Sequence, residues 1–378
     1  MKNLALLNRT ANKSGLVDVF WYGEISNCYV SGEIGKELSE STYDCFGGLV
    51  AYALTSKECR ISDCFNLADV YCGSSTLCEG AGGIVGYVRN NGDETNPLNI
   101  SYCENYGRIY SNGLQNIGGI CGRMYLKDIS SFGHVVNSAT NRIENCINYG
   151  ELTAIAEEDI YDEYGVGGIV GEIYVERDYE YSSVEVRVYC CADYGKITER
   201  EGCEGAICGI ATTTTPEDNS SAKVSFYNCL VASQEGSYGT ALCDSIIYDR
   251  GIISFEYCCN WFNEGGGSGT VYHDTENTRP TSDEKGYFYM KDCYCLDESY
   301  ETPESLDGLT RMNSESLRNF DPYTSGFDFE FTWDMSEEYY DGLPYIMNRD
   351  QQAEKAKKMY EMMEEEEEVY DMGEEGLQ

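Results

Sequence analysis

A ten-residue segment centred on a cysteine recurs along the chain, and this repeat limits the folds that the sequence can adopt. Segments 25–34, 100–109, 143–152 and 188–197 each have cysteine as their fourth residue. The anchor cysteines are 36, 39, 43, 45, 38, 29 and 35 residues apart. Repeats of about 20 to 50 residues are typical of solenoids, propellers and arrays, because one unit cannot bury its own apolar residues. The eight anchors are Cys28, Cys64, Cys103, Cys146, Cys191, Cys229, Cys258 and Cys293.

A second, glycine-rich motif alternates with the first in strict order. Segments 82–86, 118–122 and 167–171 read Gly-Gly-Ile-Val-Gly or Gly-Gly-Ile-Cys-Gly, and degenerate copies occur at 47–51, 205–209 and 239–243. β-branched and aromatic residues dominate both motifs, which favours strands over helices. We expect the Asn-Tyr-Gly segments at 105–107 and 148–150 to form turns, because Asn and Gly tolerate left-handed backbone.

Stacked strands would bury the Ile, Val and Cys residues of successive repeats as internal columns. The sequence therefore predicts an all-β fold, a right-handed parallel β-solenoid (β-helix), since crossovers in parallel sheets are right-handed. Two half-motifs per period predict about 12–15 coils and a rod of about 60–70 Å, at about 4.8 Å per coil. The polar, acidic insertions between motifs are expected to be protruding loops.

Charge and composition exclude several classes of function. Acidic residues outnumber basic ones by 66 to 26, and the net charge is −40. This field repels phosphate, so we expect no nucleic-acid binding through a basic groove. Two histidines exclude a site with several His ligands. The first apolar run ends at Leu7, shorter than the core of a signal peptide, and no run approaches the about 20 apolar residues of a membrane span. We expect no membrane insertion.

Nineteen cysteines is an odd number, so at least one thiol has no partner within the chain. No Cys-x-x-Cys spacing occurs, which argues against a zinc site. Repeat-equivalent positions indicate a packing role instead, since free cysteine behaves as a small apolar residue. We predict no cofactor and buried reduced thiols at Cys28, Cys64, Cys103, Cys146 and Cys191.

The combined pattern at 82–109, 118–152 and 167–197 resembles the GLUG-repeat family of bacterial surface proteins. The resemblance covers about residues 15–348, and the segments at 309–310, 333–334 and 342–345 resemble the module that closes such arrays. It implies a large secreted or wall-attached protein, in which the repeats serve as a stalk, adhesin or spacer beside a catalytic or anchoring domain. Some IgA-cleaving metallopeptidases carry these repeats. Their His-Glu-x-x-His motif does not occur at His134 or His273, so that activity is not carried over.

The chain divides into three predicted parts. Residues 1–300 are expected to form the solenoid, and 301–348 a C-terminal capping module that covers the last open strand edge. Residues 349–378 change to Ala, Lys, Glu and Met with an acidic block, which predicts a helical or disordered tail.

An acidic cluster between two repeats is the best candidate for calcium, which takes six to eight oxygen ligands. Its spacing lacks the glycine of a known calcium loop, so we favour a solvated acidic loop. The cluster comprises Glu157, Glu158, Asp159, Asp162 and Glu163.

Tyr106, Tyr149 and Tyr194 occupy one position of the repeat and predict an aromatic stripe. Facing solvent, the stripe would stack on sugars or anchor a protein partner; facing inward, it would be structural. We favour the structural interpretation. Asn105 and Asn148, with Asp193 in the third copy, are expected to form a hydrogen-bonded ladder at the turn.

We predict a non-enzymatic scaffold or adhesion segment of an extracellular or cell-surface protein. The predicted localisation depends on the resemblance alone. The partner of this segment would be a host protein or glycan. A first alternative is a β-helix enzyme that degrades polysaccharides with carboxylates on an exposed face. A second is an acidic DNA mimic that inhibits a DNA-binding enzyme.

Overall fold

The computed structural model describes most of the chain up to residue 316 and two short segments beyond it. The described ranges are 1–9, 12–36, 45–55, 57–72, 79–90, 97–111, 116–128, 139–155, 164–177, 183–199, 203–214, 222–232, 241–249, 251–260, 272–273, 287–296, 304–306, 308–313, 315–316, 333–335 and 344–347. Residues 1–320 form one compact unit and 321–378 a second. The secondary-structure elements β1 to β36 in these ranges are all strands, which confirms the all-β prediction. No helix in these ranges is long and apolar enough to cross a membrane.

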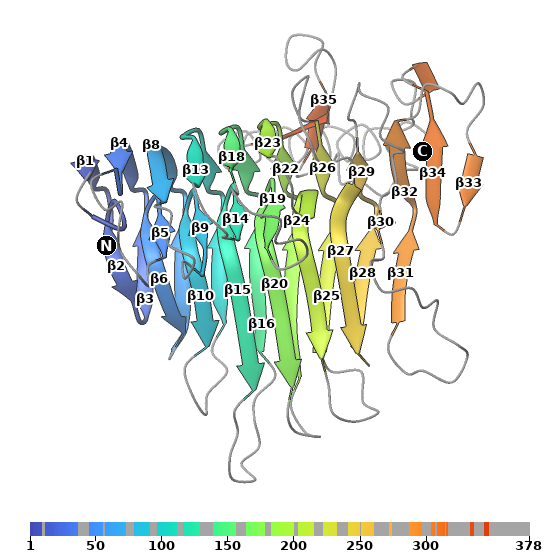
Figure 1. Cartoon of the computed structure of the whole chain (residues 1–378), viewed down its shortest axis with the longest axis horizontal. Coiled ribbons are helices and arrows are strands. Elements are labelled where there is room, and N and C mark those ends of the chain that lie inside the picture. The colour runs from blue at the N-terminus through green and yellow to red at the C-terminus, as the bar shows by residue number, and fades with distance from the viewer. Residues whose placement is uncertain are drawn as a thin grey trace, which may run out of the picture. The chain divides into compact units, whose positions relative to one another are not determined.

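Sheet A is one wall of the first unit and takes one strand from each coil (Figure 1). Its eight strands are all parallel, and each pairs in register with the equivalent strand of the next coil. They are β3 (Gly23–Ser26), β7 (Cys59–Ser62), β11 (Leu98–Ser101), β16 (Ala139–Glu144), β21 (Val184–Tyr189), β25 (Ala222–Tyr227), β28 (Ile252–Glu256) and β31 (Tyr287–Lys291).

Sheet C, the wall opposite, has a row of long strands and a row of short ones. The long row is β2 (Val17–Phe20), β6 (Val50–Thr55), β10 (Val85–Asn90), β15 (Cys121–Asp128), β20 (Val170–Arg177), β24 (Cys203–Thr214), β27 (Ala241–Asp249) and β30 (Tyr272–His273). Each of the first four glycine-rich motifs begins in the short row and ends in the long row, and the two rows join at β24. The short row is β5 (Phe46–Gly47), β9 (Ala81–Gly82), β14 (Ile117–Gly118) and β19 (Gly165–Gly167).

Sheet B forms the third wall, uppermost in Figure 1. It starts with β1 (Ala5–Arg9), β4 (Tyr29–Ile34) and β8 (Phe65–Cys72), and then divides into two rows. One row is β12 (Glu104–Asn105), β17 (Ile147–Asn148), β22 (Ala192–Asp193), β26 (Leu230–Val231), β29 (Cys259–Asn260), β32 (Cys293–Leu296), β34 (Leu309–Met312) and β33 (Glu304–Leu306). The other is β13 (Ile109–Ser111), β18 (Leu152–Ala154) and β23 (Ile197–Glu199).

The fold is a parallel β-solenoid, as predicted, but the predicted number of coils is wrong. Each full period forms one coil: the glycine-rich motif lies in sheet C, and the cysteine motif carries the chain from sheet A into sheet B. Sheet A therefore has eight strands in the described ranges rather than 12–15. At about 4.8 Å between strands it spans about 34 Å, not 60–70 Å. The prediction assigned one coil to each half-motif, whereas two half-motifs share one coil.

In each coil the residue with left-handed backbone lies at a different corner from the predicted Asn-Tyr-Gly turn. Each anchor cysteine follows a residue with φ between 49° and 54°, at the corner between sheets A and B. Gly107 and Gly150, in contrast, do not have positive φ. A Cβ on Gly107 would lie 1.9 Å from the carbonyl oxygen of Ala68 in the preceding coil. These glycines therefore permit close approach of two coils. The left-handed residues are Asn27, Asp63, Tyr102, Asn145, Cys190, Asn228, Tyr257 and Asp292.

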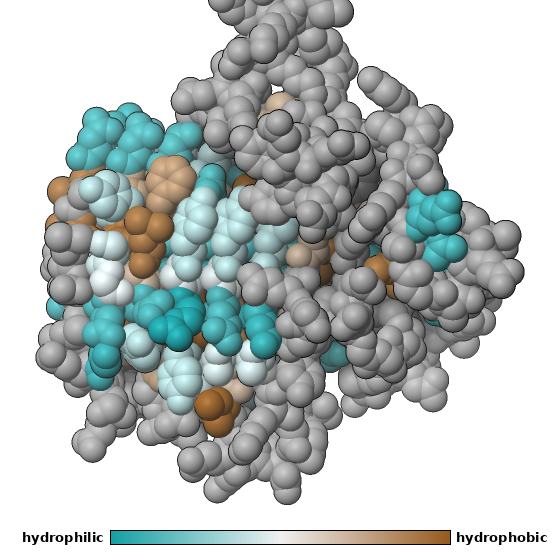
Figure 2. Space-filling model, turned by 90° about the horizontal axis from the view of Figure 1, so that it is seen from above, coloured by the Kyte–Doolittle hydropathy of each residue, from teal (hydrophilic) through white to brown (hydrophobic). Residues whose placement is uncertain are grey.

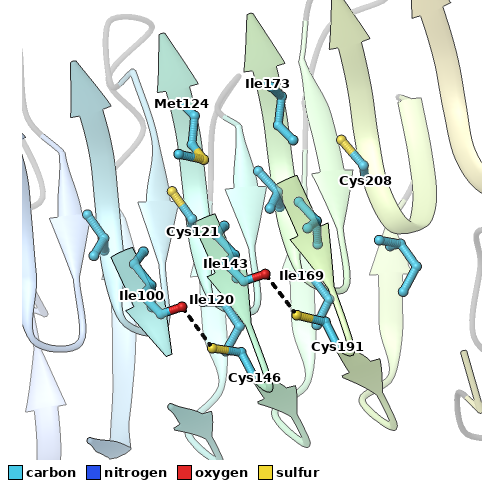
Figure 3. Packing of buried hydrophobic residues seen from close by; sticks show 14 of the residues in the cluster. Ile100, Ile120, Cys121, Met124, Ile143, Cys146, Ile169, Ile173, Cys191 and Cys208 are labelled. Atoms are coloured by element: carbon cyan, nitrogen blue, oxygen red, sulfur yellow. Dashed lines mark hydrogen bonds between the residues drawn. The ribbon is translucent and has the colours of Figure 1, made fainter. Parts of the chain in front are cut away.

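A column of cysteines runs through the interior beside columns of Ile and Val (Figure 3). All eight anchor cysteines are at most 1% exposed, and no disulfide joins the described cysteines. Each thiol donates to backbone carbonyls: Cys146 Sγ lies 3.3 Å from Glu144 O and 3.8 Å from Ile100 O. Burial raises the pKa of Cys103 and Cys146 well above the ordinary thiol value. The predicted buried thiols are confirmed in position.

The C-terminal strand of sheet B is β34, which pairs in parallel with β32, and β33 then adds in the antiparallel direction. The second unit contains the antiparallel pair β35 (Trp333–Met335) and β36 (Pro344–Ile346). The predicted boundaries at 300 and 348 stay a prediction, and the tail from 349 lies outside the described ranges.

Candidate binding surface

A ladder of buried amides underlies the outer surface of sheet B. Asn66 Nδ2 donates to Asn105 Oδ1, Asn105 Nδ2 to Asn148 Oδ1, and Asn148 Nδ2 to Asp193 Oδ1, each at 2.8 Å. All four side chains are fully buried. The predicted ladder is confirmed and starts one coil earlier, at Asn66. Its sequence signal was present, since Asn66 follows the anchor Cys64 by two residues, as Asn105 follows Cys103.

Each amide also holds the bend of its own coil. Asn66 Nδ2 donates to Ala68 O at 2.9 Å, and Ala68 N donates back to Asn66 Oδ1 at 3.1 Å. Asn148 makes the equivalent pair with Gly150, at 3.1 Å in both directions. Tyr106 follows Asn105 directly, and Tyr149 follows Asn148 in the next coil. The hydrogen bonds of the amides fix the backbone of these tyrosines and direct their side chains outward. The ladder thus sets the spacing of the side chains on the surface above it.

The predicted aromatic stripe exists and lies on the outer side of sheet B. The rings of Tyr106 and Tyr149 stack with centroids 4.8 Å apart and planes 15° apart, and those of Tyr149 and Tyr194 are 5.4 Å and 12° apart. Tyr106 is 46% exposed, Tyr149 is half-buried, and Tyr194 is only 6% exposed. The stripe is therefore structural at one end and open to solvent at the other.

Three further apolar side chains extend the open end. Leu67 is next to Tyr106 in the same column, because Asn66 and Asn105 are in register, and it is 49% exposed. Tyr29 and Phe65 are in-register neighbours in the adjacent column, 44% and 39% exposed. Figure 2, which views sheet B from outside, shows a brown apolar area at one end of a row of pale residues. We call Tyr29, Phe65, Leu67, Tyr106, Tyr149 and Tyr194 the aromatic face.

Charged groups border the aromatic face. Glu104 is in register with Phe65 on one side and Ile147 on the other, and the Tyr106 hydroxyl donates to its Oε2. Asp69 and Arg108 form an ion pair at 3.0 Å on the neighbouring column. The surface thus combines exposed rings with a carboxylate.

A second polar cluster lies on the outer side of sheet C. The composition of the sequence did not reveal it. Arg123 Nε lies 2.6 Å from Glu172 Oε2, and Asn116 Nδ2 donates to the same oxygen at 2.7 Å. The Arg123 guanidinium also lies 5.5 Å from the ring centroid of Tyr125. Burial raises the pKa of Glu172, while Arg123 favours its charged form. Strand register brings these residues together from two adjacent coils, a pairing that residue spacing alone does not show.

The other predicted site residues are not part of the described structure. Glu157, Glu158, Asp159, Asp162 and Glu163 fall within 156–163, outside the described ranges, and so does His134. His273 belongs to β30. Within the ranges that are described, no group of three or more His, Cys, Asp or Glu side chains is placed to hold a metal ion.

No family model matches the chain, and no curated protein matches it. A solved structure of a "putative immunoglobulin A1 protease from Bacteroides ovatus" is similar to it, with 18% sequence identity. The match covers 92% of this chain and 74% of that chain, at a TM-score of 0.36.

Proposed function

We propose that the chain is a non-enzymatic binding segment of a bacterial secreted or cell-surface protein, in which a rigid solenoid presents the aromatic face to a ligand. The resemblance to GLUG repeats in the sequence supports the cellular setting. The observation that carries the binding role is the group of four adjacent side chains, Tyr29, Phe65, Leu67 and Tyr106, that are each at least 39% exposed. Contiguous exposed apolar patches mark interaction sites more often than isolated exposed residues do.

Rigidity supports the same role. The buried amides fix the backbone beneath Tyr106 and Tyr149, and the two rings stack on each other. A pre-ordered surface loses little side-chain entropy when a ligand binds, so more of the contact energy appears as affinity. Tyrosine has a large apolar body and a polar tip and is enriched at interfaces for that reason.

The test is a binding screen of the full chain against a panel of glycans and host glycoproteins. Phe65→Ser should abolish or strongly weaken the binding of any ligand that uses the aromatic face. Ile247→Ser is the matched control, because Ile247 is as exposed but lies on sheet C. Equal effects of the two substitutions, or no effect of Phe65→Ser on any ligand, would contradict the proposal. Incubation with the same glycans should produce no new reducing ends.

A further inference from the structure

Glu104 is the carboxylate that borders the aromatic face beside Phe65 and Tyr106. It is half-buried, lies between Phe65 and Ile147 in the column, and accepts the hydrogen bond of the Tyr106 hydroxyl. Among the residues that the structure describes, no lysine or arginine forms an ion pair with it. Arg108, on the neighbouring column, is held by Asp69 at 3.0 Å. The negative charge of Glu104 is therefore not neutralised by the face itself.

The rings around Glu104 are placed to contact a cation. Tyr106 and Tyr149 are displaced along the coil axis and stack nearly parallel, so the faces of these rings point along the axis. Leu67 stands where the next ring of the column would be, and both it and Tyr106 are almost half-exposed. Since the two ring faces of Tyr106 are next to Tyr149 and Leu67, the exposed edge of the ring offers apolar surface to the stem of a basic side chain whose charged head reaches Glu104. A guanidinium is planar, stacks on rings and pairs with carboxylates, which distinguishes it from an ammonium.

The protein builds this combination within its own surface. On sheet C, Arg123 has Tyr125 5.5 Å from its guanidinium and Glu172 2.6 Å from its Nε. A ring, a carboxylate and a guanidinium therefore meet there in one cluster. On sheet B the chain supplies the ring and the carboxylate, Tyr106 and Glu104, in contact with each other.

The net charge of the chain favours the same kind of ligand. A charge of −40 creates a long-range field that attracts cations and accelerates their encounter, an effect that decreases with ionic strength. It also disfavours acidic glycans and phosphorylated ligands at this surface. An apolar patch bordered by a carboxylate in a negative field is complementary to a basic segment that carries apolar residues.

We infer that the aromatic face binds an arginine-bearing segment of a basic partner protein, with the guanidinium paired with Glu104 and its apolar stem against the exposed edge of Tyr106. This inference rests on the proposed binding function and deepens it by naming the ligand class. The apolar part of the segment covers Phe65 and Leu67.

The experiment measures the affinity of the full chain for three short peptides of alternating glycine and arginine, lysine or citrulline. The arginine peptide should bind most tightly and the uncharged citrulline peptide least. Glu104→Gln and Tyr106→Ser should each weaken arginine-peptide binding about 3- to 10-fold, the first by removing the carboxylate and the second by removing the ring surface that the stem contacts. Tyr106→Phe should retain most of the affinity, because it keeps the ring, and thermal unfolding of each variant checks that it is folded. Binding should weaken as salt is added.

Glu256→Gln is the matched control. Glu256 lies on sheet A and accepts the Tyr289 hydroxyl hydrogen bond at 2.9 Å, so the substitution makes the same charge change beside a tyrosine. If Glu104→Gln and Glu256→Gln weaken peptide binding equally, the effect comes from the net negative charge of the chain rather than from a contact with Glu104. That result would overturn the inference. A neutral glycan that binds in a Phe65-dependent but Glu104-independent way would also overturn it, and would leave the proposed binding function standing. Self-association that Phe65→Ser abolishes would put a second copy of the chain on the face and overturn it equally.

Discussion

Asn105 occupies the space into which a side chain at Gly83 would project. A Cβ built on Gly83 would lie 2.3 Å from Asn105 Cγ and 2.2 Å from the carbonyl oxygen of Gly119 in the next coil. The same relation joins Gly48 to Asn66 and Gly119 to Asn148. The two sequence motifs are thus two halves of one contact across the interior of a coil, which explains why they alternate along the chain.

Gly83→Ala should destabilise the solenoid strongly, by about 3 kcal/mol or more, because both obstructing groups are fixed in the interior. Urea denaturation followed by circular dichroism measures the loss. Gly23 offers a comparison, since a Cβ there meets nothing within 4 Å and only its φ of 107° opposes substitution. A cost for Gly83→Ala no larger than that for Gly23→Ala would contradict the packing argument.

Asn105→Val should cost more stability than Asn66→Val, by about 1–2 kcal/mol. Asn105 joins two amide–amide hydrogen bonds, to Asn66 and Asn148, whereas Asn66 joins one. Valine is compatible with the position, because Val30 is the equivalent residue in the first coil and is fully buried. The free energies of unfolding of the two variants provide the comparison, and equal losses would show that the amides act singly.

Stability should fall as the pH rises above about 8.5, the ordinary thiol pKa. Burial raises the pKa of Cys103, Cys146 and Cys259 in the folded chain, so the unfolded chain releases these protons first. The stabilisation is complete below the unfolded pKa and is lost between the unfolded and the folded values. The slope should reach about 1.4 kcal/mol per pH unit for each such thiol.

Urea denaturation between pH 7 and 10 tests this dependence, and Cys103→Ala should have a shallower slope than the wild type. Thiol titration gives a second readout, in which Cys45, the half-buried cysteine, reacts before the anchor cysteines. Rapid native labelling of Cys103 or Cys146 would contradict the buried column.

Arg123→Met should destabilise the protein by about 3–5 kcal/mol, because it leaves the carboxylate of Glu172 buried without its cation. Adding Glu172→Gln should restore much of the loss, since Asn116 still donates to the Gln oxygen. Burial raises the pKa of Glu172 in the folded chain. The single variant should therefore become more stable as the pH falls from 7 towards 5, whereas the double variant should not. Thermal melts at both pH values distinguish the two.

Residue identity alone determined the local part of the structure. The anchor cysteines, the Gly-Gly segments and the β-branched residues predicted strands, a parallel solenoid, buried thiols and the ladder of Asn105, Asn148 and Asp193. These features depend on one repeated position at a time, so aligned repeats are sufficient to find them. The stripe of Tyr106, Tyr149 and Tyr194 was found in the same way.

Only the tertiary structure decided how the repeats close into coils and which side of the stripe is open. The two motifs of a period lie on opposite walls of one coil because Gly83 and Asn105 pack against each other. This long-range contact makes one coil of each full period, so sheet A has eight strands in the described ranges instead of the predicted 12–15 coils. The exposure of Tyr106 and the burial of Tyr194 depend on what packs over each ring, although both occupy the same repeat position. Solvent exposure and cross-coil pairs such as Arg123 and Glu172 are properties of register and packing, which no single repeat encodes.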